Sequence, residues 1–256
     1  MKSITKRDCE QLHASLKARK YRANRVLSLL SKMFSLAREW GYCAENPVPG
    51  IQRFPEDRHE RWLQPEDELP RFLAALAAYP DQDSADALRL LLVTGCREQE
   101  ALSAEWAQFD LDGTPFWNKP SHATKERKME HVPLNDAALE LLLNMRANRK
   151  GSPFLFPGRK AGKARVTVRH AFQQVCQAAG LGEETSQGFR PSLRIHDLRH
   201  TFGSNLANRG VSAQEIGRLM GHCQLPTTMR YMHLADKALR QASNVFAKIY
   251  NQSAGC

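Results

Sequence analysis

Apolar residues recur every three or four positions through most of the chain, the spacing at which they line one side of an α-helix. The clearest stripe follows Tyr21 and ends before Gly41, a residue type that commonly stops a helix. Arg22, Arg25 and Lys32 fall outside this stripe, so the segment predicts a helix with an apolar inner face and a basic outer face. The residues predicted to face inward are Val26, Leu29, Leu30, Met33, Phe34 and Ala37.

The helical spacing is lost in the stretch ENPVPGIQRFPEDRHERW, which begins at Glu45. Three prolines and a dense run of charged residues without any period are typical of a linker. A second helix is predicted before it, from about Lys6 to Ala18, and from Gln64 onward the chain is again mostly helical. We therefore expect two domains, a small helical one over residues 1–55 and a larger one over residues 56–256.

One interruption of the helical pattern lies in the larger domain. Three short runs are separated by an Asp-Gly pair and by a charged turn, an arrangement that suits a small antiparallel sheet. The expected fold is therefore mostly α (α+β), a helical domain with a small three-stranded antiparallel sheet, preceded by the smaller helical domain. The three runs are Ala107–Leu111, Pro115–Asn118 and Lys128–Pro133. Helices are predicted near Asp136, Val166, His196 and Ser212, and again after Thr228.

The composition is that of an ordinary globular protein, with 42% hydrophobic residues among 256. No apolar run approaches the roughly 18 residues that a membrane span needs, and the N-terminus lacks the apolar core of a signal peptide. We therefore expect a cytoplasmic protein with no membrane partner. Its six cysteines are scattered without a Cys-x-x-Cys pair, which argues against a disulfide framework and against a cysteine zinc site.

The charge of the chain points to a partner, because a formal net charge of +10 is typical of proteins that bind a polyanion. Residues 1–55 carry eleven Lys and Arg residues against four Asp and Glu residues, so most of the excess lies in the small domain. A solvated basic surface is the plain alternative. The concentration into one segment favours a nucleic-acid clamp, with Arg22, Arg25 and Lys32 as its candidate DNA contacts.

The stretch TGCREQE predicts a helix that stops at Thr-Gly and a second helix that starts at about Arg97. An arginine beside a helix N-terminus makes a good phosphate pocket, since both favour an anion. Glu100, three residues further on, can hold the guanidinium by a charge-assisted hydrogen bond. The alternative is that Glu98 and Glu100 only balance the charge of Arg97 on the surface.

A second candidate cluster lies in HDLRH. On a helix, His196, Arg199 and His200 fall within an arc of roughly 100°, so three cationic or hydrogen-bonding groups share one side. The spacing of the two histidines is similar to that of the zinc-binding His-Glu-x-x-His helix. However, Asp197 stands where the catalytic glutamate belongs, and Arg199 would face the cation. A bound anion such as phosphate fits this group better than zinc does.

Three further residues carry weaker signals. His222 directly follows Gly221, the expected end of a helix, where a side chain can reach a cleft. Tyr231 shares helical spacing with neighbouring apolar residues, so alone it is typical of a packed aromatic side chain. Lys125 lies in the charged turn between two predicted strands, a place where lysines commonly serve only solubility.

Taken together, TGCREQE, ATKERK, HDLRHTFGS, LMGH and TTMRYMH resemble the tyrosine recombinase (phage integrase) family in order and approximate spacing. The resemblance covers about residues 64–248, and ANRVLSLLSKMFSLAREWGYCAENPV is similar to the second half of the family's core-binding domain. It implies a partial core-binding domain over residues 1–55 and the catalytic domain over residues 56–256. The resemblance also implies that Glu100 holds the Arg97 side chain in place without contacting the DNA itself. The active site that the resemblance implies consists of Arg97, Lys125, His196, Arg199, His222 and Tyr231.

In this family the tyrosine attacks a DNA phosphodiester, becomes linked to the 3′-phosphate and releases a 5′-hydroxyl, and a 5′-hydroxyl from a partner duplex then attacks that bond. A phenol, with a pKa near ~10, needs a base, for which His196 is the candidate. Lys125 is the candidate acid for the leaving alkoxide, with Lys119 and Lys128 as neighbouring alternatives. The resemblance implies no metal and no high-energy cofactor. The groups that would stabilise charge on the phosphate are Arg97, Arg199 and His222.

The implied partners follow from that chemistry. They are double-stranded DNA carrying a recombination site and further copies of the chain, as a homo-tetramer on DNA with a DNA-free monomer as the alternative state. A helical tail over Asp236–Ile249 would dock onto a neighbouring protomer, and DNA-bending proteins are candidate accessory partners. Three other functions share part of the pattern: strand relaxation like that of a type IB topoisomerase, DNA binding without cleavage, and a zinc hydrolase built on His196 and His200.

Overall fold

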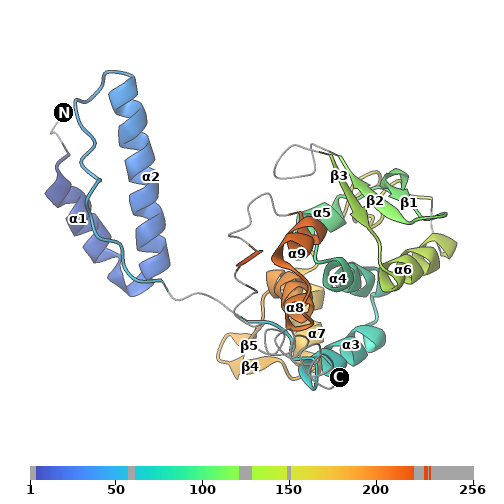
Figure 1. Cartoon of the computed structure of the whole chain (residues 1–256). Helices are drawn as coiled ribbons and strands as arrows, with labels where there is room; N and C mark the ends of the chain where they lie inside the picture. Colours follow the sequence, from blue (N-terminus) through green and yellow to red (C-terminus); the bar gives the residue numbers. More distant parts are fainter. Residues whose placement is uncertain are drawn as a thin grey trace, which may run out of the picture. The chain divides into compact units, whose positions relative to one another are not determined.

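The computed structural model describes residues 4–56, 61–120, 129–148, 151–221, 228, 229 and 231. The chain divides into two compact units, Met1–His59 and Glu60–Cys256. The division falls within the stretch predicted as a linker. Figure 1 shows the helices and strands of both units.

The N-terminal unit is a pair of helices closed by a returning segment of chain. Its elements are α1 (Lys6–Ser15), a single turn of 3₁₀ helix, η1 (Lys17–Arg19), and α2 (Lys20–Glu39), and α1 and α2 lie side by side (Figure 1). Thr5 caps α1 together with Asp8, whose carboxylate accepts from the Thr5 backbone N–H at 2.8 Å. The small core of this unit consists of Cys9, Leu27 and Val48, with Leu30, Phe34 and Ile51 packed against it.

The apolar face of α2 is narrower than the sequence predicts. Leu29 and Met33 were expected to face inward, but their side chains are 61% and 55% exposed, so this part of the prediction was wrong. The inner face runs instead through Ala23 and Leu27. The physical reason is that, in the described part of the N-terminal unit, α2 packs against α1, η1 and the returning segment at Val48, which cover a single side of it.

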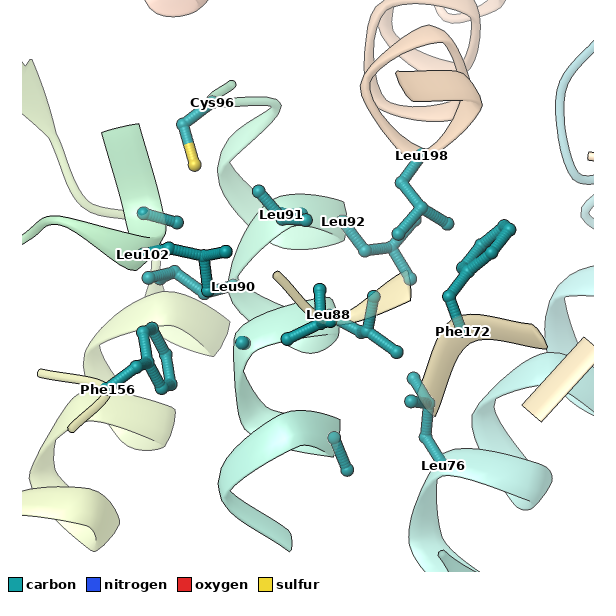
Figure 2. Packing of buried hydrophobic residues seen from close by; sticks show 14 of the residues in the cluster. Leu76, Leu88, Leu90, Leu91, Leu92, Cys96, Leu102, Phe156, Phe172 and Leu198 are labelled. Atoms are coloured by element: carbon teal, nitrogen blue, oxygen red, sulfur yellow. The ribbon is translucent and has the colours of Figure 1, made fainter. Parts of the chain in front are cut away.

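The C-terminal unit is built around helix α4, most of whose residues are buried. Other helices pack around it, and Figure 2 shows leucines of α4 meeting Leu76, Phe172 and Leu198 from three different helices. A continuous apolar core of this kind holds the ends of the helices at fixed positions. The helices are α3 (Glu68–Ala78), α4 (Gln82–Thr94), α5 (Glu98–Leu102), α6 (Asp136–Ala147), α7 (Arg169–Ala178), α8 (Ile195–Asn208) and α9 (Ala213–Met220).

The predicted three-stranded antiparallel sheet is confirmed. A 3₁₀ turn, η2 (Trp106–Gln108), leads into β1 (Phe109–Asp110), β2 (Phe116–Lys119) and β3 (Glu130–Pro133), in the order β1-β2-β3. Trp117 pairs with Phe109 on one side and with Val132 on the other. Trp117 and Lys119, two positions apart, are the buried residues of β2, as the alternation of a strand requires.

A second sheet was not predicted. Strands β4 (Gly182–Thr185) and β5 (Gly188–Pro191) form an antiparallel hairpin after α7. All four residues of β4 are exposed, so the segment lacks the alternation of apolar and polar residues that reveals a strand. The fold class is nevertheless confirmed as mostly helical with a small three-stranded antiparallel sheet. Among the helices described here, none is both long enough and apolar enough to span a bilayer.

Candidate active site

Arg97 lies at the junction between α4 and α5. Helix α4 ends at Gly95, whose backbone is left-handed (φ 62°), and α5 begins at Glu98, so Arg97 is the N-cap residue rather than part of the first turn. Its guanidinium donates to Glu100 Oε1 at 2.5 Å, and its backbone N–H donates to Glu100 Oε2 at 3.1 Å. The Arg97 side chain is 28% exposed and that of Glu100 only 4%. The carboxylate therefore holds the guanidinium from the protein side and leaves part of it accessible to a ligand.

Lys119 reaches the same carboxylate from strand β2. Its ammonium donates to Glu100 Oε2 at 2.8 Å and lies 4.5 Å from the centroid of the Trp117 ring. The lysine side chain is 2% exposed. The sequence offers Lys119 as a neighbouring alternative to Lys125 for the acid and does not predict its burial. The signal that could have found it is its alternation with Trp117, which places both side chains on the buried face of the strand.

Two cations thus share the carboxylate of Glu100. Burial of this side chain, the largest single influence, opposes ionisation. The charge and hydrogen bond of Lys119, together with the hydrogen bonds from Arg97, outweigh it and hold the pKa of Glu100 below its ordinary value. Glu100 is therefore an anion at neutral pH, and both of its oxygens are engaged.

Arg199, on α8, is buried and connects two helix ends. One of its terminal nitrogens donates to the carbonyl of Gly95 at 2.5 Å, and the other donates to the carbonyl of Met220 at 2.6 Å. It also interacts electrostatically with Arg97 and Tyr231. Burial and the nearby charge of Arg97 lower the pKa of Arg199, but a guanidinium stays protonated in proteins. Arg199 therefore fixes the end of α4 and the end of α9 around a second positive charge.

Tyr231 is packed against α8 and α9. The residue is 3% exposed, and its hydroxyl lies 3.1 Å from Nδ1 of His200, within hydrogen-bonding distance. Gly203 makes room for the ring, since a Cβ at that position would lie 2.9 Å from two of its carbon atoms. Tyr231 is thus a packed aromatic side chain, as its helical spacing alone predicts, and its hydroxyl also has a hydrogen-bonding partner. The residues that surround the ring are Ala207, Ile216 and Met220, with Phe202, Leu206 and Val211 packed against them.

His196 and His200 form a pair on the same helix. Their ring centroids are 5.0 Å apart with the rings edge to face, and His196 is exposed whereas His200 is partly buried. Sequence reasoning placed both on one arc but kept only His196 as a site residue. The structure adds His200, because this imidazole is the one within hydrogen-bonding distance of Tyr231.

The remaining predicted site residues, Lys125 and His222, lie outside the described residues. Gly221, which precedes His222, lies against strand β3: a Cβ at Gly221 would lie 2.5 Å from Glu130 Oε2, so the end of α9 touches the start of β3. On the N-terminal unit, the three predicted DNA contacts are exposed residues of α2. In the ranges that the structure describes, no three His, Cys, Asp or Glu side chains gather closely enough to hold a metal ion.

The chain is similar to integrases of phages and to bacterial recombinases. A profile of the phage integrase family matches residues 62–238. The integrase of Escherichia phage P2 is 28% identical over 220 residues, which is 86% of this chain and 57% of the relative. The tyrosine recombinase XerD of Caulobacter vibrioides is 33% identical over 187 residues, covering 68% of this chain and 57% of the relative. The chain thus spans little more than half the length of these curated relatives.

Solved structures share the fold. The Tn1549 transposon integrase in complex with transposon right end DNA superposes with a TM-score of 0.74 at 20% identity, over 96% of this chain and 86% of that one. A lambda integrase tetramer bound to a Holliday junction gives a TM-score of 0.68 at 20% identity, over 88% of this chain and 66% of that one. With the family profile matching more than half of the sequence, this chain belongs to the phage integrase family, the family of the tyrosine recombinases, and contains its catalytic domain.

Proposed function

We propose that this chain is a site-specific DNA recombinase of the integrase type, which cleaves and rejoins DNA strands through a tyrosine linked to a 3′-phosphate. The observation that carries the proposal is the convergence of two guanidinium groups and a phenol: Arg199 donates to the carbonyl of Gly95, two residues before Arg97, and to that of Met220, which shares a buried cluster with Tyr231. Two fixed positive charges beside one nucleophile suit attack on a phosphodiester, which gains negative charge as the bond forms. We further propose that it acts in the bacterial cytoplasm, encoded by a prophage or another mobile element.

The first step transfers the phosphodiester from DNA to the protein. The Tyr231 oxygen forms a bond to phosphorus while the bond from phosphorus to the 5′-oxygen breaks. The phenolic proton passes to a base, for which we propose His196, and the departing 5′-oxygen takes a proton from Lys125. The bond energy is kept in the phosphotyrosine, so the reverse attack by a 5′-hydroxyl needs no energy-rich cofactor. In this proposal the arginines supply the positive charge, and no metal takes part.

Tyr231 has to move for this step. Its residue is 3% exposed in the described position, and its hydroxyl lies 3.1 Å from Nδ1 of His200, so the ring is packed inside the protein. We propose that DNA binding draws the tyrosine from this packed position toward the phosphate. His200 then holds the hydroxyl in the DNA-free protein, while the exposed His196 meets it at the phosphate.

The test of the function is a nicked suicide duplex that carries a candidate attachment site. Cleavage beside the nick releases a short strand that diffuses away, so the covalent intermediate accumulates. We expect a protein–DNA adduct on a denaturing gel, with the linked peptide containing Tyr231. Chelators should leave its yield unchanged. The absence of any adduct on a duplex that the protein binds specifically would reject the recombinase proposal in favour of a DNA-binding protein without catalysis.

DNA binding by the N-terminal unit is expected to depend steeply on salt. Each phosphate that the protein neutralises releases counterions. Each such contact therefore adds about 0.9 to the magnitude of the slope of log K against log salt. Replacing Arg22, Arg25 and Lys32 together by alanine should weaken binding and reduce the slope by about 2 to 3. Arg38→Ala is the control, because it removes a charge from another side of the same helix. Titration at several salt concentrations measures the slope, and equal slopes for the triple variant and the wild type would refute the clamp.

Assembly is the last part of the proposal. Strand exchange between two duplexes needs four cleavage events, and the solved lambda integrase complex is a tetramer on a Holliday junction. We propose that this chain forms a homo-tetramer on paired recombination sites, assisted at some sites by DNA-bending proteins. A topoisomerase-like enzyme would instead relax supercoiled DNA as a monomer without a second duplex.

A further inference from the structure

The most unusual buried group in the C-terminal unit is the ammonium of Lys119. A lysine is seldom fully buried unless it is paired, and this one is 2% exposed on the inner face of strand β2. Its described partners are Glu100 Oε2 at 2.8 Å and the Trp117 ring at 4.5 Å from the centroid. Buried in this way, it does not reach the solvent side where a phosphate would bind. Lys119 therefore needs a role different from that of the acid proposed for Lys125.

Charge balance around Glu100 suggests that role. Arg97 is oriented by this carboxylate, with its guanidinium on Oε1 and its backbone N–H on Oε2. A carboxylate that orients an arginine also cancels its charge, because the two together are neutral toward a phosphate a few ångströms away. With Lys119 bound to Oε2, the group of three carries one net positive charge. The orientation of Arg97 is then kept without loss of its attraction for the phosphate.

We propose that Lys119 is a positioning residue: by neutralising Glu100, it lets this carboxylate hold Arg97 toward the DNA phosphate while the site stays positive. The inference rests on the proposed function and deepens it. Lys119 touches neither the DNA nor the reacting atoms. It acts on the reaction through Glu100 and Arg97, because hydrogen bonds connect Lys119 on β2 to Glu100 and Glu100 to Arg97 at the N-cap of α5.

Few of the described groups around Glu100 could neutralise its negative charge in place of Lys119. Arg97 belongs to the same junction, Lys119 comes from β2, and Arg199 on α8 interacts with Glu100 electrostatically. The thiol of Cys96, also buried, has its pKa raised by burial and so is neutral at physiological pH. Arg199 is already bonded to two carbonyl groups. Among the described residues, Lys119 is thus the cation that can cancel the charge of Glu100 while the charge of Arg97 stays available to a phosphate.

The test is a set of variants assayed by the rate of adduct formation at saturating suicide duplex, together with the Kd for DNA. Lys119→Met leaves Glu100 and Arg97 as a neutral pair. We therefore expect the rate to fall by about 10- to 100-fold, the range found when a residue that positions a metal ligand is lost, with the Kd for DNA nearly unchanged. Lys119→Arg keeps the charge and should restore most of the rate. Lys163→Met, which removes an exposed lysine of the same unit, is the matched control and should behave as the wild type.

The double variant separates charge balance from packing. Glu100→Gln combined with Lys119→Met removes both charges and leaves Arg97 positive, so its rate should exceed that of Lys119→Met alone. A rate for Lys119→Met within about threefold of the wild type, or a double variant no faster than the single one, overturns the proposal. If Lys119→Met does not fold, Glu100→Gln is compared with the double variant. Equal rates support the proposal, and a large further loss overturns it.

A second measurement does not depend on catalysis. Inorganic phosphate titrated calorimetrically into the DNA-free protein should bind several-fold more weakly to Lys119→Met than to the wild type, because Arg97 is less positive and less well oriented. Unchanged phosphate affinity overturns the positioning role. If the wild type forms no adduct but its phosphate affinity depends on Lys119, the proposed function fails while the positioning role stands.

Discussion

Tyr231→Phe is expected to abolish the covalent protein–DNA adduct while DNA binding remains unchanged. The substitution removes only the oxygen that would form the bond to phosphorus, so no step of strand cleavage remains possible. The ring itself is retained, and it keeps its packing against the small core that α8 and α9 form around Met220. The lost contact with His200 should lower the free energy of unfolding by only about 0.5–1.5 kcal/mol. A suicide duplex assay and a binding titration on the same preparation measure both effects.

Tyr79→Phe is the matched control for this variant. Its hydroxyl donates to Gln174 Oε1 at 2.8 Å, so the substitution also removes a hydrogen-bonded phenolic oxygen from the same unit. We expect full adduct yield from Tyr79→Phe. An adduct that persists in Tyr231→Phe would assign the nucleophile to another residue, and a parallel loss of DNA binding would show that the substitution acts through the fold.

The part of the site that lies within one helical turn could be predicted from sequence. Arg97 and Glu100 are three residues apart, and the hydrogen bonds between them are those that a helix start allows. His196, Arg199 and His200 were likewise placed on one side of a helix, and α8 spans all three. Local geometry is fixed by backbone periods that do not depend on the rest of the fold.

The contact between Glu100 and Lys119 could not be predicted in the same way. They are nineteen positions apart in the sequence, and the contact exists because the fold brings the buried face of β2, which carries Trp117 and Lys119, to Glu100 on α5. A sequence pattern gives the alternation of a strand but not the element that covers it. From the sequence, Lys119 is therefore only an alternative acid beside Lys125, whereas the structure buries it against Glu100.

The same limit explains the misassigned face of α2 and the role of Arg199. Periodicity gave a broad apolar stripe that included Leu29 and Met33, but the width of the buried face depends on how many elements pack against the helix. For Arg199, the sequence predicted a group that faces an anion. Its burial and its two carbonyl partners on other helices follow from tertiary packing, and they make it a structural residue as well as a candidate for binding phosphate.

This double role predicts the second large effect, for Arg199→Met. Methionine fills similar space but leaves the carbonyl groups of Gly95 and Met220 without their donor, and it removes the charge beside Tyr231. Loss of one donor to a developing oxyanion costs about 10²–10³ in rate, so adduct formation should fall at least that far. Hydrogen bonds from a charged donor contribute about 1.5–3 kcal/mol each, and two carbonyl groups are left without a donor, which outweighs the desolvation cost that disappears with the buried charge. We therefore expect a lower Tm as well.

Arg199→Lys distinguishes charge from geometry. Lysine keeps the positive charge, but a single ammonium lacks the planar fork that lets one guanidinium reach both Gly95 and Met220. We expect adduct formation to stay about 10²-fold below the wild type, with a smaller loss of Tm than in Arg199→Met. Arg209→Met, at the exposed end of the same helix, is the control and should match the wild type in both assays. Near-normal cleavage by Arg199→Lys would mean that charge alone suffices at this position, and the connection between the ends of α4 and α9 would then have no part in catalysis.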